Sequence, residues 1–440
     1  MDSEDIPIPL SLLLLPPQPS PPSSSALKAA YAQPLAYVLR SVAKLPTHSS
    51  NASILDIALP CVFSSTQDRS VRSSIYDSVQ KLVARLYRLV SIICAQQSIE
   101  VEGPGGVNVR VFLFEYSQEL QFDGTEQPSS LRSSPSGPLI DLPTLAGCDR
   151  DWMRVYSFGC EGGEVLLRYF KNLRAQVVPK AENLDIVIVL GDTEMDQASN
   201  SEPSVSQTPK RSEIKHESVA VGGTFDHLHA GHKLLLTMTA FVLEPSSDSS
   251  RNRSFVNTRN KTLTVGITGD ELLQNKRFAE YMQSWGDRLD GVLNFLTGIL
   301  DFSPPDKASK VWRRRVPSTS GELFEVTLLH PHMKIRCVEI SDPFGPTITD
   351  ESISALVISA ETRGGGTAVN EKRREKGWAE LEVFEVDVLD AVEEGDVDSG
   401  AVKEDFASKI SSTEIRRRKC DMAQTGVERS SKRQRTKQQG

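Results

Sequence analysis

Cysteine is scarce in this sequence and never falls into a metal-binding or redox pattern. The 440 residues include six cysteines, and none of them forms a C-x-x-C pair. Zinc sites and redox motifs use such close pairs, and small disulfide-bonded domains need many more cysteines for their length. The spacing therefore argues against a disulfide scaffold and a cysteine-based metal site, and it favours a reducing compartment.

Long apolar runs and N-terminal positive charge are also lacking. The apolar segment 10–15 ends at two prolines and is far too short to span a bilayer. No Lys or Arg precedes Lys28, whereas secretory and mitochondrial leaders carry positive charge near their start. The net charge of −8 argues against a chain-wide nucleic-acid surface. We therefore expect a cytoplasmic protein without membrane or nucleic-acid partners.

The first part of the chain is expected to contain a disordered N-terminus and a folded α/β domain. Residues 1–26 are rich in proline and serine and are expected to be disordered. Residues 27–190 alternate helix-like and strand-like segments, which is typical of an α/β domain, but they contain no catalytic motif and their role is not indicated. The expected helices are 27–43 and 76–94, and the expected strands are 53–59, 107–115 and 184–190.

A second folded region follows a polar linker, residues 191–212. Residues 213–423 alternate strands and helices, which predicts a Rossmann-like domain with a doubly wound parallel sheet. A flexible acidic insertion is expected near 387–405, and residues 303–331 are expected to form a surface insertion. The expected elements are strands at 218–222, 263–268, 335–340, 355–359 and 382–386, and helices at 231–241, 271–285, 287–302 and 367–376, with a short helix after Ser411.

The most informative segment is G-T-F-D-H-L-H-A-G-H, residues 223–232. It joins a strand-like run to a helix-like run, so its glycine turn places backbone N–H groups where a phosphate can bind. Four of the seven histidines, His216, His227, His229 and His232, lie within residues 216–232. The simpler alternative is an ordinary tight turn with histidines placed by chance in a polar loop.

This segment resembles the GTFDxxHxGH signature of the nucleotidylyltransferase superfamily. Over roughly residues 213–420 the chain is similar to phosphopantetheine adenylyltransferases of the archaeal and eukaryotic type. Three further segments match that family in order, namely D-P-F-G-P at 342–346, V-I-S-A-E-T at 357–362 and I-S-S-T-E-I-R at 410–416. The resemblance implies adenylyl transfer from ATP, with Mg²⁺, to 4′-phosphopantetheine, giving dephospho-coenzyme A and pyrophosphate.

The resemblance also assigns roles to individual residues. It implies that His229, His232 and Lys276 are catalytic, and that Thr224, Lys276 and Arg288 bind the acceptor substrate. It implies no protein metal ligand. The nucleotide-binding set is Gly222, Gly223, Phe225, Gly231, His232, Ser359, Glu361, Thr362, Arg363, Ser411, Ser412, Thr413 and Arg416.

Simpler structural roles compete with several of these assignments. Lys276 has the alternative of being a solvated surface lysine. Arg288 could instead be an ordinary surface arginine, in a helix whose start is capped by Asp287. The spacing of Ser411 and Glu414 also fits a capping box.

Competing functions stay open at this point. A CTP-dependent nucleotidylyltransferase would be expected to show an R-T-x-G-I-S-T-like element, and nicotinate mononucleotide adenylyltransferases have Asn-Pro where Asp226-His227 stand. A non-catalytic scaffold is the alternative from another class. The sequence contains no GxxxxGK(S/T) loop, so we expect a separate dephospho-coenzyme A kinase and association with other coenzyme A biosynthesis enzymes.

Two regional expectations complete the sequence analysis. The strand–helix alternation predicts that residues 212–423 fold by themselves, unless the N-terminal region covers an apolar face. Residues 424–440 are expected to be a disordered basic tail. Its Lys and Arg cluster indicates either a nuclear share or merely a solvated end.

Overall fold

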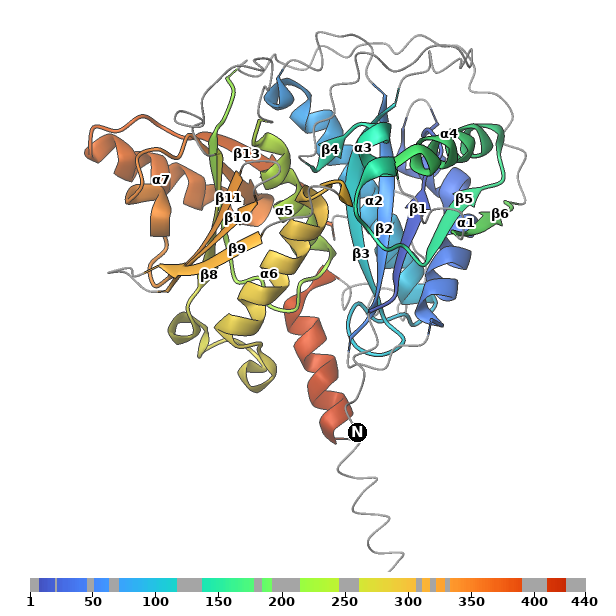
Figure 1. Cartoon of the computed structure of the whole chain (residues 1–440). Coiled ribbons are helices and arrows are strands. Elements are labelled where there is room, and N and C mark those ends of the chain that lie inside the picture. The colour runs from blue at the N-terminus through green and yellow to red at the C-terminus, as the bar shows by residue number, and fades with distance from the viewer. Residues whose placement is uncertain are drawn as a thin grey trace, which may run out of the picture.

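The computed structural model contains two α/β halves that lie side by side (Figure 1). Each half is built around one sheet, a six-stranded sheet in the first half and a seven-stranded sheet in the second. The expected α/β fold class, with a Rossmann-like domain preceded by a further α/β region, is confirmed. The structure describes residues 8–19, 22–45, 51–62, 71–116, 137–177, 184–191, 214–244, 261–305, 311–316, 322–328, 333–389 and 410–424.

The N-terminal sheet is parallel throughout, with strand order β4-β3-β2-β1-β5-β6. The predicted helices and strands of this half are confirmed, apart from shifts of a few residues at their ends. The strands are β1 (Leu10–Leu14), β2 (Ser53–Val62), β3 (Val107–Tyr116), β4 (Leu139–Ile140), β5 (Arg154–Phe158) and β6 (Asp185–Val189). The helices are α1 (Ser24–Ala43), α2 (Tyr76–Gln96), α3 (Leu142–Gly147) and α4 (Glu161–Val177), with a short 3₁₀ turn η1 (Arg72–Ile75).

The expected disorder of residues 1–26 is wrong for the apolar segment. Leu10–Leu14 forms β1, which pairs in parallel with both β2 and β5 near the centre of the sheet. The side chains of Leu12, Leu13 and Leu14 are fully buried. The strand is a short apolar run covered on both faces, as parallel strands are, and it ends at Leu14, shortly before two prolines.

The C-terminal sheet has the order β13-β12-β7-β8-β11-β10-β9. Strands β13 to β11 are parallel, as predicted, while β10 and β9 add an antiparallel hairpin at one edge. The strands are β7 (Ser218–Gly223), β8 (Lys261–Thr268), β9 (Val311–Val316), β10 (Leu323–Leu328), β11 (Met333–Ile340), β12 (Ala355–Ser359) and β13 (Glu382–Val386). The helices are α5 (Ala230–Val242), α6 (Trp285–Leu300) and α7 (Arg363–Glu375), with a further helix over residues 412–424.

Two predictions in this half are wrong. Residues 303–331 are not merely a surface insertion, because β9 and β10 extend the sheet and β10 buries Val326 and Leu328. The expected helix 271–285 is replaced by two 3₁₀ turns, η3 (Asp270–Leu273) and η4 (Ala279–Tyr281). Phe278 adopts a left-handed backbone conformation with φ of 55°, which interrupts a right-handed helix.

The two halves share one hydrophobic core. Helix α2 of the first half packs against α5 of the second, and side chains of both belong to a single cluster of buried residues. All residues of α5 from Lys233 to Val242 are buried, which is typical of a helix covered on every side. The described contacts therefore indicate that the N-terminal half covers an apolar face of the C-terminal half, the case in which residues 212–423 are not expected to fold by themselves.

Polar contacts also join the two halves. Asp56 is fully buried and accepts hydrogen bonds from Arg110 and Arg150 at 2.7 and 2.8 Å, and Arg150 reaches across to the carbonyl oxygen of Asp301 at 2.9 Å. Burial opposes ionisation of this carboxyl, but the two guanidinium groups hold the pKa of Asp56 below its usual value.

Several predictions fall on parts of the chain outside the described residues. These are the linker, most of the acidic insertion and the basic tail, and the exact domain boundaries stay predictions with them. Over the described ranges, no helix is long and apolar enough to cross a membrane.

Candidate active site

The glycine-rich motif lies where a doubly wound sheet places its ligands. From β7, the strands β8 and β11 follow in order on one side of the sheet. Strands β12 and β13 follow on the other side of β7. The direction of strand addition therefore reverses between β7 and β12, and doubly wound sheets bind their ligands in the crevice at the carboxyl ends of such strands. The motif follows β7 directly, and the predicted segment 359–363 follows β12, so the structure brings both to this crevice.

The motif loop leaves the first turn of α5 open. His229 occupies the N-cap position of α5, and its side chain makes no capping hydrogen bond there. A Cβ atom built on Gly222 would meet nothing within 4 Å, whereas one on Gly223 would lie 3.0 Å from the ring of Phe225. Uncapped N–H groups at a helix start, together with the helix dipole, favour a bound anion. Gly231 lies in the same first turn.

His229 and His232 form a stacked pair at this helix start. Their ring centroids are 3.8 Å apart with an interplanar angle of 23°, and Phe225 packs against His232. Among the described residues, the Nδ1 atoms of both histidines lack a hydrogen-bond partner. Burial lowers the pKa of His232 to about 3 and that of His229 well below its usual value, so both rings are neutral at physiological pH. Each neutral ring keeps hydrogen-bonding capacity for a ligand.

The segment 410–416 contacts the motif loop. The Ser412 hydroxyl donates to the carbonyl oxygen of Asp226 at 2.7 Å, and Arg416 forms an ion pair with the buried carboxylate of Asp226. Arg416 also donates to the carbonyl oxygen of Arg277 and is only 2% exposed. The guanidinium therefore fixes the loop in this structure, and its predicted contact with a phosphate stays a prediction. Ser411 and Thr413 lie beside Ser412 at the start of this helix.

Arg288 has a similar supporting position. Its fully buried guanidinium donates to the carbonyl oxygens of Thr224, Thr268 and Gln283, at 2.8, 2.8 and 3.2 Å. It also pairs with Asp270 at 2.6 Å. These bonds hold the turn after β7 against the turn after β8. Direct contact between Arg288 and a polyphosphate remains a prediction, and it would require some of these bonds to be replaced.

The other predicted residues lie near the surface. Lys276 is exposed on the turn between η3 and η4, and Thr224 is partly exposed at the end of β7. Ser359 is partly exposed, while Glu361, Thr362 and Arg363 are exposed at the start of α7. Arg363 forms an ion pair with Glu385 of β13. The side chains of Ser359, Glu361, Thr362 and Arg363 are therefore accessible to a ligand at the carboxyl end of β12.

The predicted Mg²⁺ has no preformed protein site in the described part of the chain. Within these ranges, no group of three or more His, Cys, Asp or Glu side chains is arranged to hold a metal ion. Mg²⁺ accompanying ATP needs no such cage, because it is commonly bound through substrate phosphates and water.

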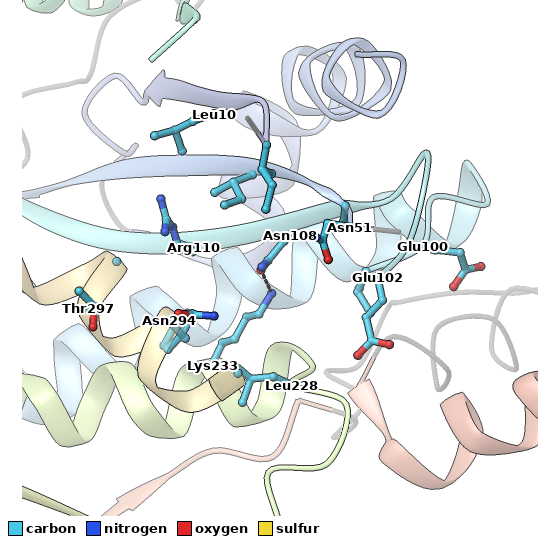
Figure 2. Close-up of a pocket in the computed structure, with 18 of the residues that line it drawn as sticks. Leu10, Asn51, Glu100, Glu102, Asn108, Arg110, Leu228, Lys233, Asn294 and Thr297 are labelled. Carbon is cyan, nitrogen blue, oxygen red and sulfur yellow. Dashed lines mark hydrogen bonds between the residues drawn. The ribbon is translucent and has the colours of Figure 1, made fainter. Parts of the chain in front are cut away.

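A cavity of about 1070 Å³ lies between the two halves, on the other face of the motif loop. Phe225, Leu228 and Lys233 contribute to its lining, whereas His229 and His232 do not. Lys233 points from α5 to Asn108 of β3 and donates a hydrogen bond of 2.7 Å to its side-chain oxygen (Figure 2). Burial lowers the pKa of Lys233 to about 8. The loop therefore faces the crevice on one side and the N-terminal half on the other.

Sequence reasoning missed the residues that hold the motif loop in place. Asp226 accepts from the backbone N–H of Gln283 at 2.9 Å, and Gln283 in turn accepts from the backbone N–H of His227 at 2.7 Å. Glu102 lies 3.0 Å from the ring of His227, although 125 residues separate them. Asp226 could have been found, because a carboxylate inside a phosphate-binding motif is conspicuous. No local sequence pattern links Glu102 to the motif.

Each similarity to known proteins covers less than half of the chain. Residues 1–195 match a family model described as a domain of unknown function (DUF8446). An uncharacterized protein of Schizosaccharomyces pombe is 35% identical over 204 residues, which are 46% of this chain and 48% of that protein. A phosphopantetheine adenylyltransferase of Saccharomyces cerevisiae is 32% identical over 203 residues, again 46% of this chain and 48% of that protein. The match thus spans about half the length of these two relatives.

An archaeal relative is matched over most of its length. The phosphopantetheine adenylyltransferase of Pyrococcus abyssi is 26% identical over 203 residues, which cover 90% of that protein but 46% of this chain. A crystal structure of a protein with unknown function from Archaeoglobus fulgidus is 22% identical and covers 39% of this chain and 98% of that one, with a TM-score of 0.24. The chain is therefore similar, over less than half its length, to proteins named phosphopantetheine adenylyltransferase.

Proposed function

We propose that the protein transfers the adenylyl group of ATP to 4′-phosphopantetheine, giving dephospho-coenzyme A and pyrophosphate. The observation that carries the proposal is the pair His229 and His232 at the open start of α5, in the crevice between β7 and β12. This arrangement is suited to hold the phosphates of ATP while the phosphate of the acceptor attacks and pyrophosphate leaves. The names of the yeast and archaeal relatives support the choice of substrates.

The chemistry requires positioning and charge stabilisation more than a protein nucleophile. An oxygen of the acceptor phosphate attacks the α-phosphorus of ATP in line, and the bond from that phosphorus to the oxygen of the β-phosphate breaks. Pyrophosphate leaves with the bonding electron pair. The attacking phosphate is already anionic, so no strong general base is needed. The main barrier is the repulsion of two polyanions and the charge that builds on the α-phosphate.

The chain's own groups are suited to reduce this barrier. The N–H groups at the start of α5 and the rings of His229 and His232 would donate hydrogen bonds to the phosphates. Lys276 would move its exposed ammonium toward the acceptor phosphate. Thr224 would offer its hydroxyl or backbone N–H at the end of β7. Mg²⁺, arriving with ATP, would offset part of the triphosphate charge.

Pyrophosphate release tests the proposal and its rivals together. The purified full chain should release pyrophosphate with Mg²⁺, ATP and 4′-phosphopantetheine, and mass spectrometry should detect dephospho-coenzyme A. CTP in place of ATP, and nicotinate mononucleotide in place of phosphopantetheine, should give much slower release. A preference for CTP or for the mononucleotide would point to the rival transferases, and no release with any pair would favour the scaffold.

Lys276→Ala should raise the KM for 4′-phosphopantetheine about tenfold or more, with a smaller change in the KM for ATP. The reason is that Lys276 is proposed to hold the acceptor phosphate in both the ground state and the transition state, which is uniform binding. Initial rates with each substrate varied in turn measure the two constants. Lys372→Ala, an exposed lysine on α7 paired with Glu375, is the matched control. Equal changes for both substrates, or none, would refute this role.

A further inference from the structure

The N-terminal half contacts the motif segment at two points, one in the turn that precedes β3 and one in β3 itself. Glu102 of this turn lies 3.0 Å from Nδ1 of His227, and Asn108 of β3 accepts from Lys233 at 2.7 Å. His227 and Lys233 stand immediately before and after the segment that contains His229 and His232. The segment 228–232 is therefore flanked on both sides by contacts with one short stretch of the N-terminal half, and Figure 2 shows the contact between Lys233 and Asn108.

The contacts of His227 define its charge. Nδ1 faces the carboxylate of Glu102, and Nε2 lies 3.0 Å from the carbonyl oxygen of Tyr281. A carbonyl oxygen and an ionised carboxylate both accept hydrogen bonds and cannot donate them. Both ring nitrogens must therefore carry a proton, which makes His227 an imidazolium whose ring is fixed at both ends.

The backbone of His227 explains why such fixing matters. Its φ of 45° lies in the left-handed region, and so does the φ of 53° at Phe225. Residues other than glycine are strained in this region, and they stay there only when the surroundings enforce it. The ring bonds of His227, and its backbone N–H bond to Gln283, supply that enforcement.

The same carboxylate also holds the helix 412–424. Lys419 donates to Glu102 at 3.1 Å, while Ser412 and Arg416 of this helix bind Asp226 in the motif loop. Glu102 thus connects the loop and the helix that packs behind it. These three segments lie far apart in the sequence but meet at one carboxylate.

We infer that Glu102 is a positioning residue of the transferase centre, through which the N-terminal half holds the motif loop in its working geometry. This inference rests on the proposed function, and it gives the region that matches a domain of unknown function a role in the reaction. Glu102 acts through His227 and the loop, and not through contact with substrate.

Glu102→Gln compared with Glu100→Gln provides a matched test. Glu100 belongs to the same turn and pairs with Arg418 of the same helix at 2.9 Å, and this ion pair does not involve the motif loop. We expect Glu102→Gln to lower kcat about tenfold to a hundredfold with a smaller change in KM, since small displacements of reacting groups cost that much. Glu100→Gln should change kcat less than twofold.

The pH profile separates positioning from a general loss of stability. Burial opposes protonation of His227, but Glu102 raises its pKa above the usual value by hydrogen bonding and charge, with a contribution from Asp226. The other charged groups nearby are Lys419, which pairs with Glu102, and Arg416, which pairs with Asp226; His229 and His232 are neutral. Glu102→Gln lowers the pKa of His227, so its loss of kcat should be smallest near pH 5.5 and should grow as pH rises toward 8.

A measurement on the unaltered protein covers the case in which a variant fails to fold. Nitrogen-15 NMR of the histidine rings should show both nitrogens of His227 still protonated above the pH at which an ordinary histidine loses its proton. An active protein with a neutral His227 ring would overturn the inference, and so would equal losses in the two variants at every pH. An inactive wild-type protein would instead overturn the proposed function, which keeps the two failures distinguishable.

Discussion

Replacing His232 with alanine should lower kcat for pyrophosphate release about 100- to 1000-fold while the KM values change little. His232 lies at the open start of α5, and its Nδ1 atom has no hydrogen-bond partner within the described ranges. The neutral ring binds the ground state modestly, because its pKa of about 3 leaves it uncharged. In the proposed reaction its interaction strengthens as negative charge builds on the α-phosphate, so its removal should affect mainly the transition state.

Steady-state kinetics on folded protein would test this expectation. Thermal unfolding of the variant should match that of the wild type, which would separate a catalytic loss from a folding defect. His232→Asn, which keeps a hydrogen-bond donor, should lose less activity than His232→Ala. Wild-type kcat in the alanine variant would remove His232 from the mechanism.

Separating the halves should abolish the folded state of the C-terminal half. A fragment of residues 212–423 exposes the side of α5 that α2 covers, although every residue of α5 from Lys233 to Val242 is buried in the full chain. It also leaves Glu244 without the backbone N–H of Arg72, a contact of 2.7 Å. Exposure of so large an apolar surface favours aggregation. We therefore expect the fragment to be insoluble, or to unfold without a cooperative transition.

Co-expression with residues 1–211 provides the control for this prediction. The two fragments should associate, remain soluble and recover adenylyl transfer, because their shared core forms again. A monomeric 212–423 fragment with a cooperative unfolding transition would show that the N-terminal half is not needed for folding. If that fragment also kept full activity, the role inferred for Glu102 would fail with it.

The sequence allowed most regular elements of this fold to be predicted. Amphipathic helices such as α2 and apolar strands such as β12 carry clear periodicity, and their observed bounds agree closely with the predicted ones. The errors have local causes. Strand β1 is short and bounded by prolines, and the arginines of β9 conceal an edge strand whose pairing depends on β10. The replacement of helix 271–285 by 3₁₀ turns follows from the left-handed backbone of Phe278, which no periodicity indicates.

The sequence predicted the segments of the candidate site but not the direction of their side chains. Motif spacing placed segments directly after β7 and β12, which are neighbouring strands in the structure. It could not reveal that Arg288 and Arg416 turn inward to carbonyl oxygens and to Asp226, since the residue type is the same for either orientation. The bond between Glu102 and His227 spans 125 residues and follows only from how the halves pack.

The central position of β1 has a practical consequence for handling the gene. A start site placed after Leu15 would remove the strand that joins β2 to β5, and would leave the two parts of the N-terminal sheet without their common neighbour. Because the core of this half continues into the C-terminal half, the damage would reach the crevice through α2 and α5. A bulky N-terminal fusion joined close to Leu10 would carry the same risk, so purification tags are better joined to the C-terminal end.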